Sequence, residues 1–99
     1  MMEQPLASIV VITYNQEHSL PVTLDCLLKQ KTKFPIEIVV GEDCSTDGTR
    51  EVLADYAQRY PDVIHPIYNE KNKGILGNYV STLSQCRGKY ISGCAGDDH

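Results

Sequence analysis

Apolar and polar positions alternate along the chain in blocks that predict strands and helices in succession. Residues 8–13 are β-branched and almost wholly apolar, as is typical of a strand buried on both faces. A polar stretch follows, and apolar residues then recur at helical spacing over residues 19–30. The chain therefore opens with a strand, a polar turn and an amphipathic helix.

The same alternation continues to the end of the sequence. Further strands are predicted over residues 36–40, 63–68 and 89–94, and a second helix over residues 48–60. Pro66 interrupts the third strand, which favours a place at the edge of the sheet. Strands and helices in strict alternation, with short connections, predict an α/β fold with an open, mainly parallel sheet and helices on both faces.

A third helix is expected between the last two strands. Its apolar face is predicted from residues at helical spacing, which are Ile75, Leu76, Tyr79, Val80, Leu83 and Cys86. Gly88 is expected to end this helix as its C-terminal cap. We therefore expect the apolar side of this helix to be part of the core.

Composition narrows the class of protein. The 99 residues suit one domain or part of one, with 41% hydrophobic residues, 22% charged residues and a net charge of −4. This balance argues against disorder and against sequence-independent binding to nucleic acid. No apolar run reaches the ~20 residues of a membrane span, and the first residues lack the pattern of a signal peptide. We expect a cytoplasmic protein in which all 4 cysteines are free thiols, with membrane association through a C-terminal part beyond this chain as the open alternative.

Polar and acidic residues gather where strands end. Residues 13–17, 42–47 and 96–98 each follow a predicted strand, and the carboxyl ends of parallel strands share one rim. Carboxylates crowded on such a rim suit a hard divalent cation, Mg²⁺ or Mn²⁺, that shares phosphate oxygens with a substrate. The phosphate-binding patterns GxxxxGK[ST] and GxGxxG are absent from the sequence.

These segments resemble those of a known family. Residues 8–15 are similar to the opening strand of the family 2 glycosyltransferases, which have the Rossmann-like GT-A fold. Residues 36–49 resemble the second strand of that family and its Asp-Asp-x-Ser-x-Asp segment. Residues 72–74 with Asn78 resemble its third stretch, and residues 88–98 its metal-binding strand end. The resemblance covers nearly the whole chain, with four motifs in order.

The resemblance implies a function. The protein would be an inverting glycosyltransferase that moves a sugar from a nucleotide-diphosphate sugar, with UDP as the expected nucleotide, to a glycan or other acceptor in cell-surface polysaccharide synthesis. Mg²⁺ or Mn²⁺ would be the cofactor. Residues 1–99 would form the N-terminal nucleotide-sugar-binding part of the domain. The acceptor half and the catalytic base are expected downstream of His99, so this chain alone is expected to be inactive.

Carried over residue by residue, the resemblance also predicts a site. The expected nucleotide-binding residues are Thr13, Tyr14, Asn15, Glu17, Glu42, Asp43, Asn78 and Asp97. Glu42 stands where the family usually has an Asp facing the base, with Asp43 supporting that contact. Asp97 and Asp98 match the acidic pair at the metal and the diphosphate. Ala95 departs from the family, whose members often have an acidic residue there.

Other interpretations of these residues stay open. Asp43 and Asp47 would also serve as turn formers or helix caps, and Asn72 as the residue that shapes the turn before Gly74. Asn78 would also suit a cap or a solvent-facing position. Two rival functions remain. One is a catalytically incomplete nucleotide-binding module that self-associates through open sheet edges. The other is a nucleotidyltransferase-like α/β protein, against which the missing Gly-rich first loop argues.

Overall fold

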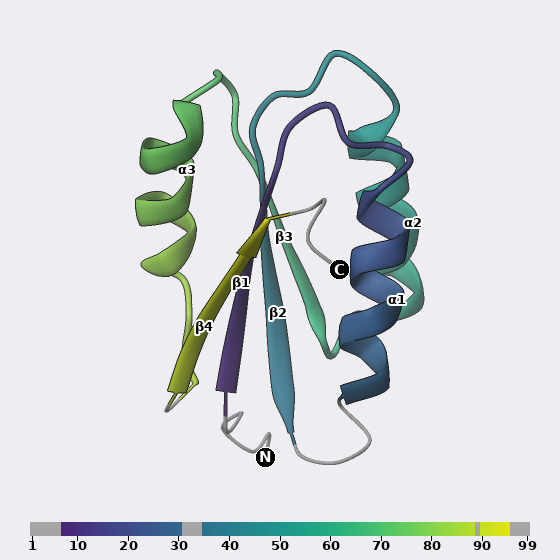
Figure 1. The fold of residues 1–99 in the computed structure, drawn as a ribbon, viewed down its shortest axis with the longest axis vertical. Coiled ribbons are helices and arrows are strands. Elements are labelled where there is room, and N and C mark those ends of the chain that lie inside the picture. Colours follow the sequence, from purple (N-terminus) through teal and green to yellow (C-terminus); the bar gives the residue numbers. More distant parts are fainter. Residues whose placement is uncertain (1–6, 31–34, 89, 96–99) are drawn as a thin grey trace.

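The computed structural model describes residues 7–30, 35–88 and 90–95. Strands and helices alternate along the chain as predicted (Figure 1). The elements are β1 (Ala7–Thr13), α1 (Leu20–Gln30), β2 (Ile36–Glu42), α2 (Thr49–Arg59), β3 (Ile64–Tyr68), α3 (Gly74–Leu83) and β4 (Tyr90–Ala95). β2 continues two residues beyond its predicted end, because Gly41 and Glu42 still pair with β1 and β3.

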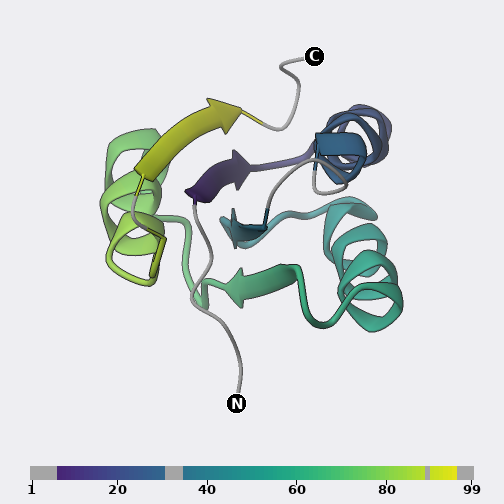
Figure 2. The same cartoon turned by 90° about the horizontal axis from the view of Figure 1, so that it is seen from below.

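The four strands form one sheet in the order β3-β2-β1-β4, and every neighbouring pair is parallel. β3 lies at the edge, as Pro66 predicted, because proline lacks the N–H that a central strand needs. Helices α1 and α2 cover one face and α3 covers the other (Figure 2). The expected open parallel α/β fold with helices on both faces is therefore confirmed.

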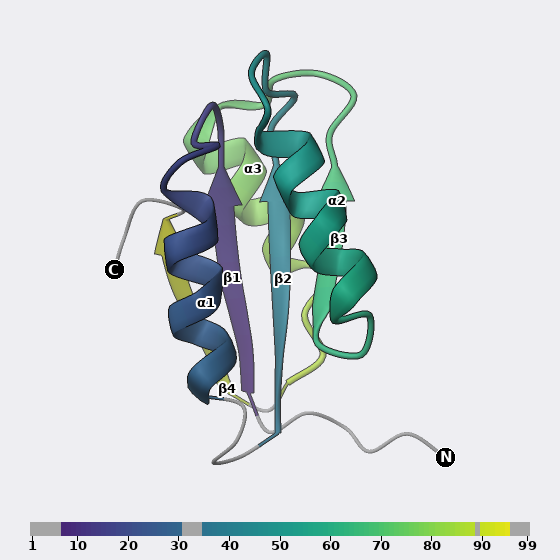
Figure 3. The ribbon, with the colours of Figure 1, turned by 90° about the vertical axis from the view of Figure 1, so that its right-hand side faces the viewer.

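The apolar core fills the space between the sheet and the pair α1 and α2, which lie side by side over it (Figure 3). Its buried side chains include Val11, Val40, Leu24, Leu53 and Ile64. The leucines of α1 and α2 fall on one helical face, and that face is the one turned to the sheet. This half of the molecule follows the hydrophobic pattern of the sequence.

Helix α3 follows that pattern only in part: Tyr79, Leu83 and Cys86 of its predicted buried face are half-buried, but the other three residues are exposed. Ile75, Leu76 and Val80 are 81%, 76% and 56% exposed, whereas the buried residues of the helix are Asn78 and Thr82. The polar pair is buried because both side chains find hydrogen-bond partners there. Directed bonds, rather than apolar burial, thus decide which side of α3 faces the sheet.

The C-terminal cap predicted for α3 is also wrong. The helix ends at Leu83 with Ser84 as its cap. Gly88 instead passes close to β1, where its N–H donates to Ser8 Oγ (2.6 Å). A Cβ on Gly88 would lie 2.5 Å from backbone atoms of Ala7 and Ser8, so the glycine is needed for this close approach.

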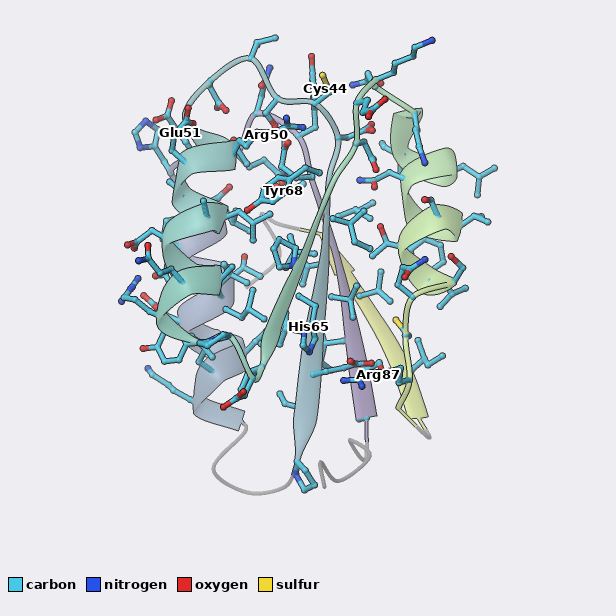
Figure 4. The ribbon with its side chains drawn as sticks, turned by 180° about the vertical axis from the view of Figure 1, so that it is seen from behind. Cys44, Arg50, Glu51, His65, Tyr68 and Arg87 are labelled. Atoms are coloured by element: carbon cyan, nitrogen blue, oxygen red, sulfur yellow. The ribbon has the colours of Figure 1, made fainter. Side chains whose placement is uncertain are left out.

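A buried carboxylate ties the amino ends of the strands together. Glu37 on β2 accepts hydrogen bonds from Ser8 Oγ (2.5 Å) and from the N–H of Arg87 (2.6 Å), and the Arg87 guanidinium lies 3.3 Å away. Burial raises the pKa of Glu37, but the hydrogen bonds from Ser8 and Arg87 lower it by more than burial raises it. The pKa of Glu37 therefore lies below its usual value. His65 Nε2 lies 3.7 Å from Glu37 and has no hydrogen-bond partner within the described residues. This cluster is structural and lies far from the strand ends predicted to hold the ligand (Figure 4).

Two further findings concern the described part of the chain. None of its helices is long and apolar enough to cross a membrane. Cys26, Cys44 and Cys86 are free thiols, as expected. The side chain of Cys94 lies outside the part of the chain that the structure describes.

Candidate functional site

A pocket of about 460 Å³ opens at the carboxyl ends of β1 and β2, between the loop after β1 and the start of α3. Ligands of parallel α/β sheets bind at this end of the strands. The pocket is lined by Ile12, Thr13, Tyr14, Gln16, Asp43, Asn72, Gly74, Ile75 and Asn78. Four of the predicted nucleotide-binding residues, Thr13, Tyr14, Asp43 and Asn78, are therefore brought together.

Thr13 and Tyr14 form one side of the pocket. Thr13 is buried at the end of β1, and its hydroxyl donates to Gln16 Oε1 (2.8 Å). Tyr14 is 45% exposed, so part of this residue is open to solvent. An exposed aromatic ring beside a pocket offers a surface on which a planar ligand can stack.

Asp43 is the carboxylate of the pocket. It is 3% exposed and caps the start of α3, where Oδ1 accepts from the N–H of Lys73 (2.7 Å) and Oδ2 from the N–H of Gly74 (3.0 Å). Oδ1 also accepts from Asn69 Nδ2 (3.0 Å). A carboxylate has about four acceptor positions, so these three bonds leave one, on Oδ2. Asp43 thus caps the start of α3 and also lines the pocket.

Asn72 shapes the turn before Gly74, which is the structural role that the sequence suggested for it. Its Oδ1 accepts from the N–H of Gly74 (3.0 Å), which shapes the turn before α3, and its Nδ2 donates to the Asp43 carbonyl (3.3 Å). Gly74 has φ +79°, a conformation that favours glycine. The turn places both residues on the pocket wall.

Glu42 does not line the pocket, in contrast to the role the resemblance implied. Its side chain is 0% exposed, and its two oxygens accept from the N–H of Ser45 (2.7 Å) and from Arg50 Nε (2.6 Å). The hydrogen bond to Glu42 is the main cause that raises the pKa of Arg50. The guanidinium also stacks over Tyr68, 5.3 Å from the ring centre (Figure 4). Glu42 therefore anchors α2 to the sheet.

Asn15 and Glu17 also lie outside the pocket lining, where they join the loop after β1 to the loop after β2. Asn15 has φ +52°, its N–H donates to Ser45 Oγ (2.9 Å), and its Oδ1 accepts from the N–H of Thr46 (2.8 Å). The Glu17 carboxylate lies against Gly48, where a Cβ would come within 2.6 Å of Oε2. We call the bonds of Asn15 to Ser45 and Thr46 the loop latch.

The predicted metal ligands Asp97 and Asp98 lie outside the described residues. Within residues 7–30, 35–88 and 90–95, no group of three or more His, Cys, Asp or Glu side chains is placed to hold a metal ion. The metal assignment stays a prediction about the residues after β4.

Sequence reasoning missed part of the pocket lining. Gln16 belongs to the polar stretch 13–17, which the sequence places at the strand ends where ligands bind, so its position at the pocket could have been predicted. Ile75 could not have been predicted in this way, because its apolar side chain suggests a place in the core. It is instead 81% exposed and lines the pocket.

Comparison with known proteins gives matches over almost the whole chain. The family model described as Glycosyl transferase family 2 matches residues 8–99. An uncharacterized protein of Mycobacterium tuberculosis is 42% identical over 92 residues, which are 93% of this chain and 27% of that protein. The putative teichuronic acid biosynthesis glycosyltransferase TuaG of Bacillus subtilis is 32% identical over 95 residues, covering 96% of this chain and 37% of its own length. The chain thus spans about a third of these relatives or less.

Solved structures share the fold. The mannosyltransferase PcManGT of Pyrobaculum calidifontis, in complex with GDP-Man and Mn²⁺, superposes with a TM-score of 0.83 at 24% identity over 96% of this chain and 28% of its own. Residues 1–349 of TarS from S. aureus, in complex with UDP, superpose with a TM-score of 0.76 at 31% identity, over 92% of this chain and 27% of that one. The fold, the pocket at its strand ends and the family match over residues 8–99 agree, and the chain belongs to glycosyl transferase family 2.

Proposed function

We propose that this chain is the nucleotide-sugar-binding part of a glycosyltransferase that acts in polysaccharide synthesis. The observation that carries the proposal is the pocket at the ends of β1 and β2, where the Tyr14 ring and the Asp43 carboxylate line one cavity. An aromatic surface and a single free acceptor suit a planar base that presents an N–H group. The family match supports sugar transfer as the reaction.

We propose UDP as the nucleotide of the donor. Asp43 has one acceptor position left after its bonds to Asn69, Lys73 and Gly74. Uracil offers one ring N–H, whereas guanine offers a ring N–H and an amino group side by side. The TarS structure in complex with UDP supports this choice, and the PcManGT structure with GDP-Man makes GDP the competitor to test.

We propose that Asp97 and Asp98 hold the divalent cofactor, Mg²⁺ or Mn²⁺. When bound, such an ion would stabilise negative charge on the departing nucleotide diphosphate. The chain's own described residues have a different task, which is to hold and orient the base: Tyr14 by ring contact and Asp43 by accepting its N–H. Thr13 and Asn78 complete the polar lining near that carboxylate.

An inverting transfer also needs a base that takes the proton of the acceptor hydroxyl. Asp43 is the one carboxylate among the described pocket residues, and its hydrogen bonds to three N–H groups already engage it in holding Asn69 and the start of α3. We therefore propose that the base and the acceptor site come from the part of the longer relatives that this chain does not span.

Calorimetric titration with UDP and with GDP, each with and without Mn²⁺, tests the proposal. We expect UDP to bind more tightly than GDP, and Asp43→Asn to weaken UDP binding by about tenfold or more, since the hydrogen bond lost is to a charged group. Asp62→Asn, an exposed carboxylate after α2, is the matched control and should bind as the wild type does. Equal affinity of the Asp43→Asn variant would contradict the assignment.

Two further measurements separate the rival functions. Slow release of free sugar from a UDP-sugar in the absence of acceptor favours a transferase over a nucleotidyltransferase. Light scattering at increasing concentration tests self-association through the sheet edges, and a monomer at all concentrations would argue against the self-associating module.

A further inference from the structure

Helix α3 is held to the sheet by a chain of buried amides. Asn78 Nδ2 donates to the carbonyl oxygen of Gly41 on β2 (2.8 Å). Asn78 Oδ1 accepts from Asn69 Nδ2 (2.9 Å), and the same Asn69 nitrogen donates to Asp43 Oδ1 (3.0 Å). We call this path from Gly41 through Asn78 and Asn69 to Asp43 the amide relay. All four residues are buried.

The relay has one possible direction. The Gly41 carbonyl can only accept, so Asn78 must present its NH₂ group there and its oxygen to Asn69. Asn69 in turn uses both of its side-chain hydrogens, one toward Asn78 and one toward Asp43. Each amide therefore fixes the orientation of the next, and the sheet backbone sets the orientation of the whole path.

The backbone of Asn69 is fixed as well. Its N–H donates to the Glu42 carbonyl (2.9 Å), and its carbonyl accepts from the Arg50 guanidinium (2.8 Å). The donor that reaches Asp43 is thus held from two sides, by the end of β2 and by α2. A group so constrained gives the carboxylate little freedom to rotate.

The relay ends on the carboxylate of the pocket rather than on another structural group. We infer that Asn69 and Asn78 are positioning residues, which orient Asp43 so that its remaining acceptor position on Oδ2 faces the ligand. The inference rests on the proposed function, in which Asp43 accepts an N–H of the base. It adds Asn69, which lies outside the pocket lining, to the residues on which nucleotide binding depends, and it gives Asn78 a positioning role.

Asn69→Asp tests the relay through pH. The introduced carboxylate has no hydrogen to donate and stands 3.0 Å from the position of Asp43 Oδ1. Two carboxylates at this distance share a proton with a raised pKa. That proton restores the bond toward Asp43 but not the one toward Asn78, whose oxygen still accepts from Thr82. We expect UDP affinity, as a ratio to the wild type, to be about tenfold or more lower at about pH 8 and to recover to within about threefold at about pH 5.5. The ratio removes the titration of the diphosphate itself.

Asn78→Ala tests the link to the sheet. It breaks the relay between Gly41 and Asn69, and we expect UDP affinity to fall by about tenfold. Thr82→Val is the matched control: Thr82 is equally buried on α3 and also donates to Asn78 (3.2 Å), but it lies beside the relay path. This control should lower thermal stability without changing UDP affinity.

The outcomes divide cleanly. Recovery of the Asn69→Asp variant at low pH, with loss of binding in Asn78→Ala but not in Thr82→Val, supports positioning. Wild-type UDP affinity in both Asn variants overturns it. So does a loss of UDP affinity that is equal at every pH and follows the loss of stability.

If the wild type binds neither UDP nor GDP, the proposed function fails for this chain. The amide relay is then tested by the hydrogen-exchange rates of the Lys73 and Gly74 backbone amides, which donate to Asp43. Faster exchange there in Asn78→Ala supports the relay, and unchanged exchange overturns it.

Discussion

Gly41 on β2 lies directly against two buried side chains of α3, and its substitution gives a sharp test of the packing described above. A Cβ built on Gly41 would clash with Thr82 Oγ1 and with Asn78 Oδ1. Both atoms belong to buried side chains that make hydrogen bonds, so neither can rotate away without losing a partner. Gly41→Ala must therefore move α3 outward or break these bonds.

The expected cost follows from two contributions. Overpacking a filled interior typically costs about 1–3 kcal/mol. Losing the bond from Asn78 to the Gly41 carbonyl adds about 1 kcal/mol. We expect Gly41→Ala to lower the free energy of unfolding by about 2–4 kcal/mol. Urea unfolding followed by circular dichroism measures this as a lower midpoint at an unchanged slope.

Gly77→Ala is the matched control, because Gly77 lies on the exposed side of the same helix. A Cβ there meets only the Lys73 side chain, at 3.3 Å, and that side chain can move into solvent. Replacing a glycine inside a helix by alanine should stabilise the protein by about 0.5–1 kcal/mol. The reasoning about α3 would be refuted if Gly41→Ala unfolded at the wild-type midpoint.

Two other predictions concern the buried carboxylates. Glu37→Gln should lower the free energy of unfolding by about 2 kcal/mol near neutral pH, because it removes the charge that accepts from Arg87. The pKa of Glu37 lies below its ordinary value of 4.5, so its contribution is complete above that pH and is lost as pH falls through the lowered pKa. Urea unfolding at several pH values should show the two proteins converging in acid. Arg50→Ala removes the partner of the buried Glu42 and should cost about 1–3 kcal/mol, less than a fully buried pair because Arg50 is 41% exposed. An unchanged melting temperature would show that Glu42 does not depend on Arg50.

The strands, their parallel order and the core under α1 and α2 could be predicted from sequence, because their apolar positions repeat with the period of the element they form. The buried face of α3 could not. Its apolar residues have helical spacing, but the side that faces the sheet is set by Asn78, whose partners Gly41 and Asn69 lie outside the helix. Hydrophobic periodicity carries no information about such partners.

The site was predictable to a similar degree. The motif located the acidic pair Glu42 and Asp43 at the end of β2 but did not tell which of the two lines the pocket. Side chains alternate along a strand, so Gly41 and Glu42 point to opposite faces, and Asp43 continues on the side of Gly41 and α3. Choosing between Glu42 and Asp43 therefore required knowing which face α3 covers. The latch role of Asn15 was hidden for the same reason, since its partners lie about 30 residues away.

The loop latch has a consequence for the kinetics and cost of ligand capture. Asn15 ties the segments after β1 and β2 to each other through two hydrogen bonds that exist before any ligand arrives. Each rotamer-rich side chain that a ligand must immobilise costs about 0.5–1.5 kcal/mol of binding free energy. Because these two bonds form during folding, a ligand at the pocket would meet two loops that are already tied together. The affinity for a ligand should therefore depend little on thermal motion of these two loops. Variants that break the loop latch should bind the ligand more slowly and at a larger entropic cost, although they lose no direct contact with it.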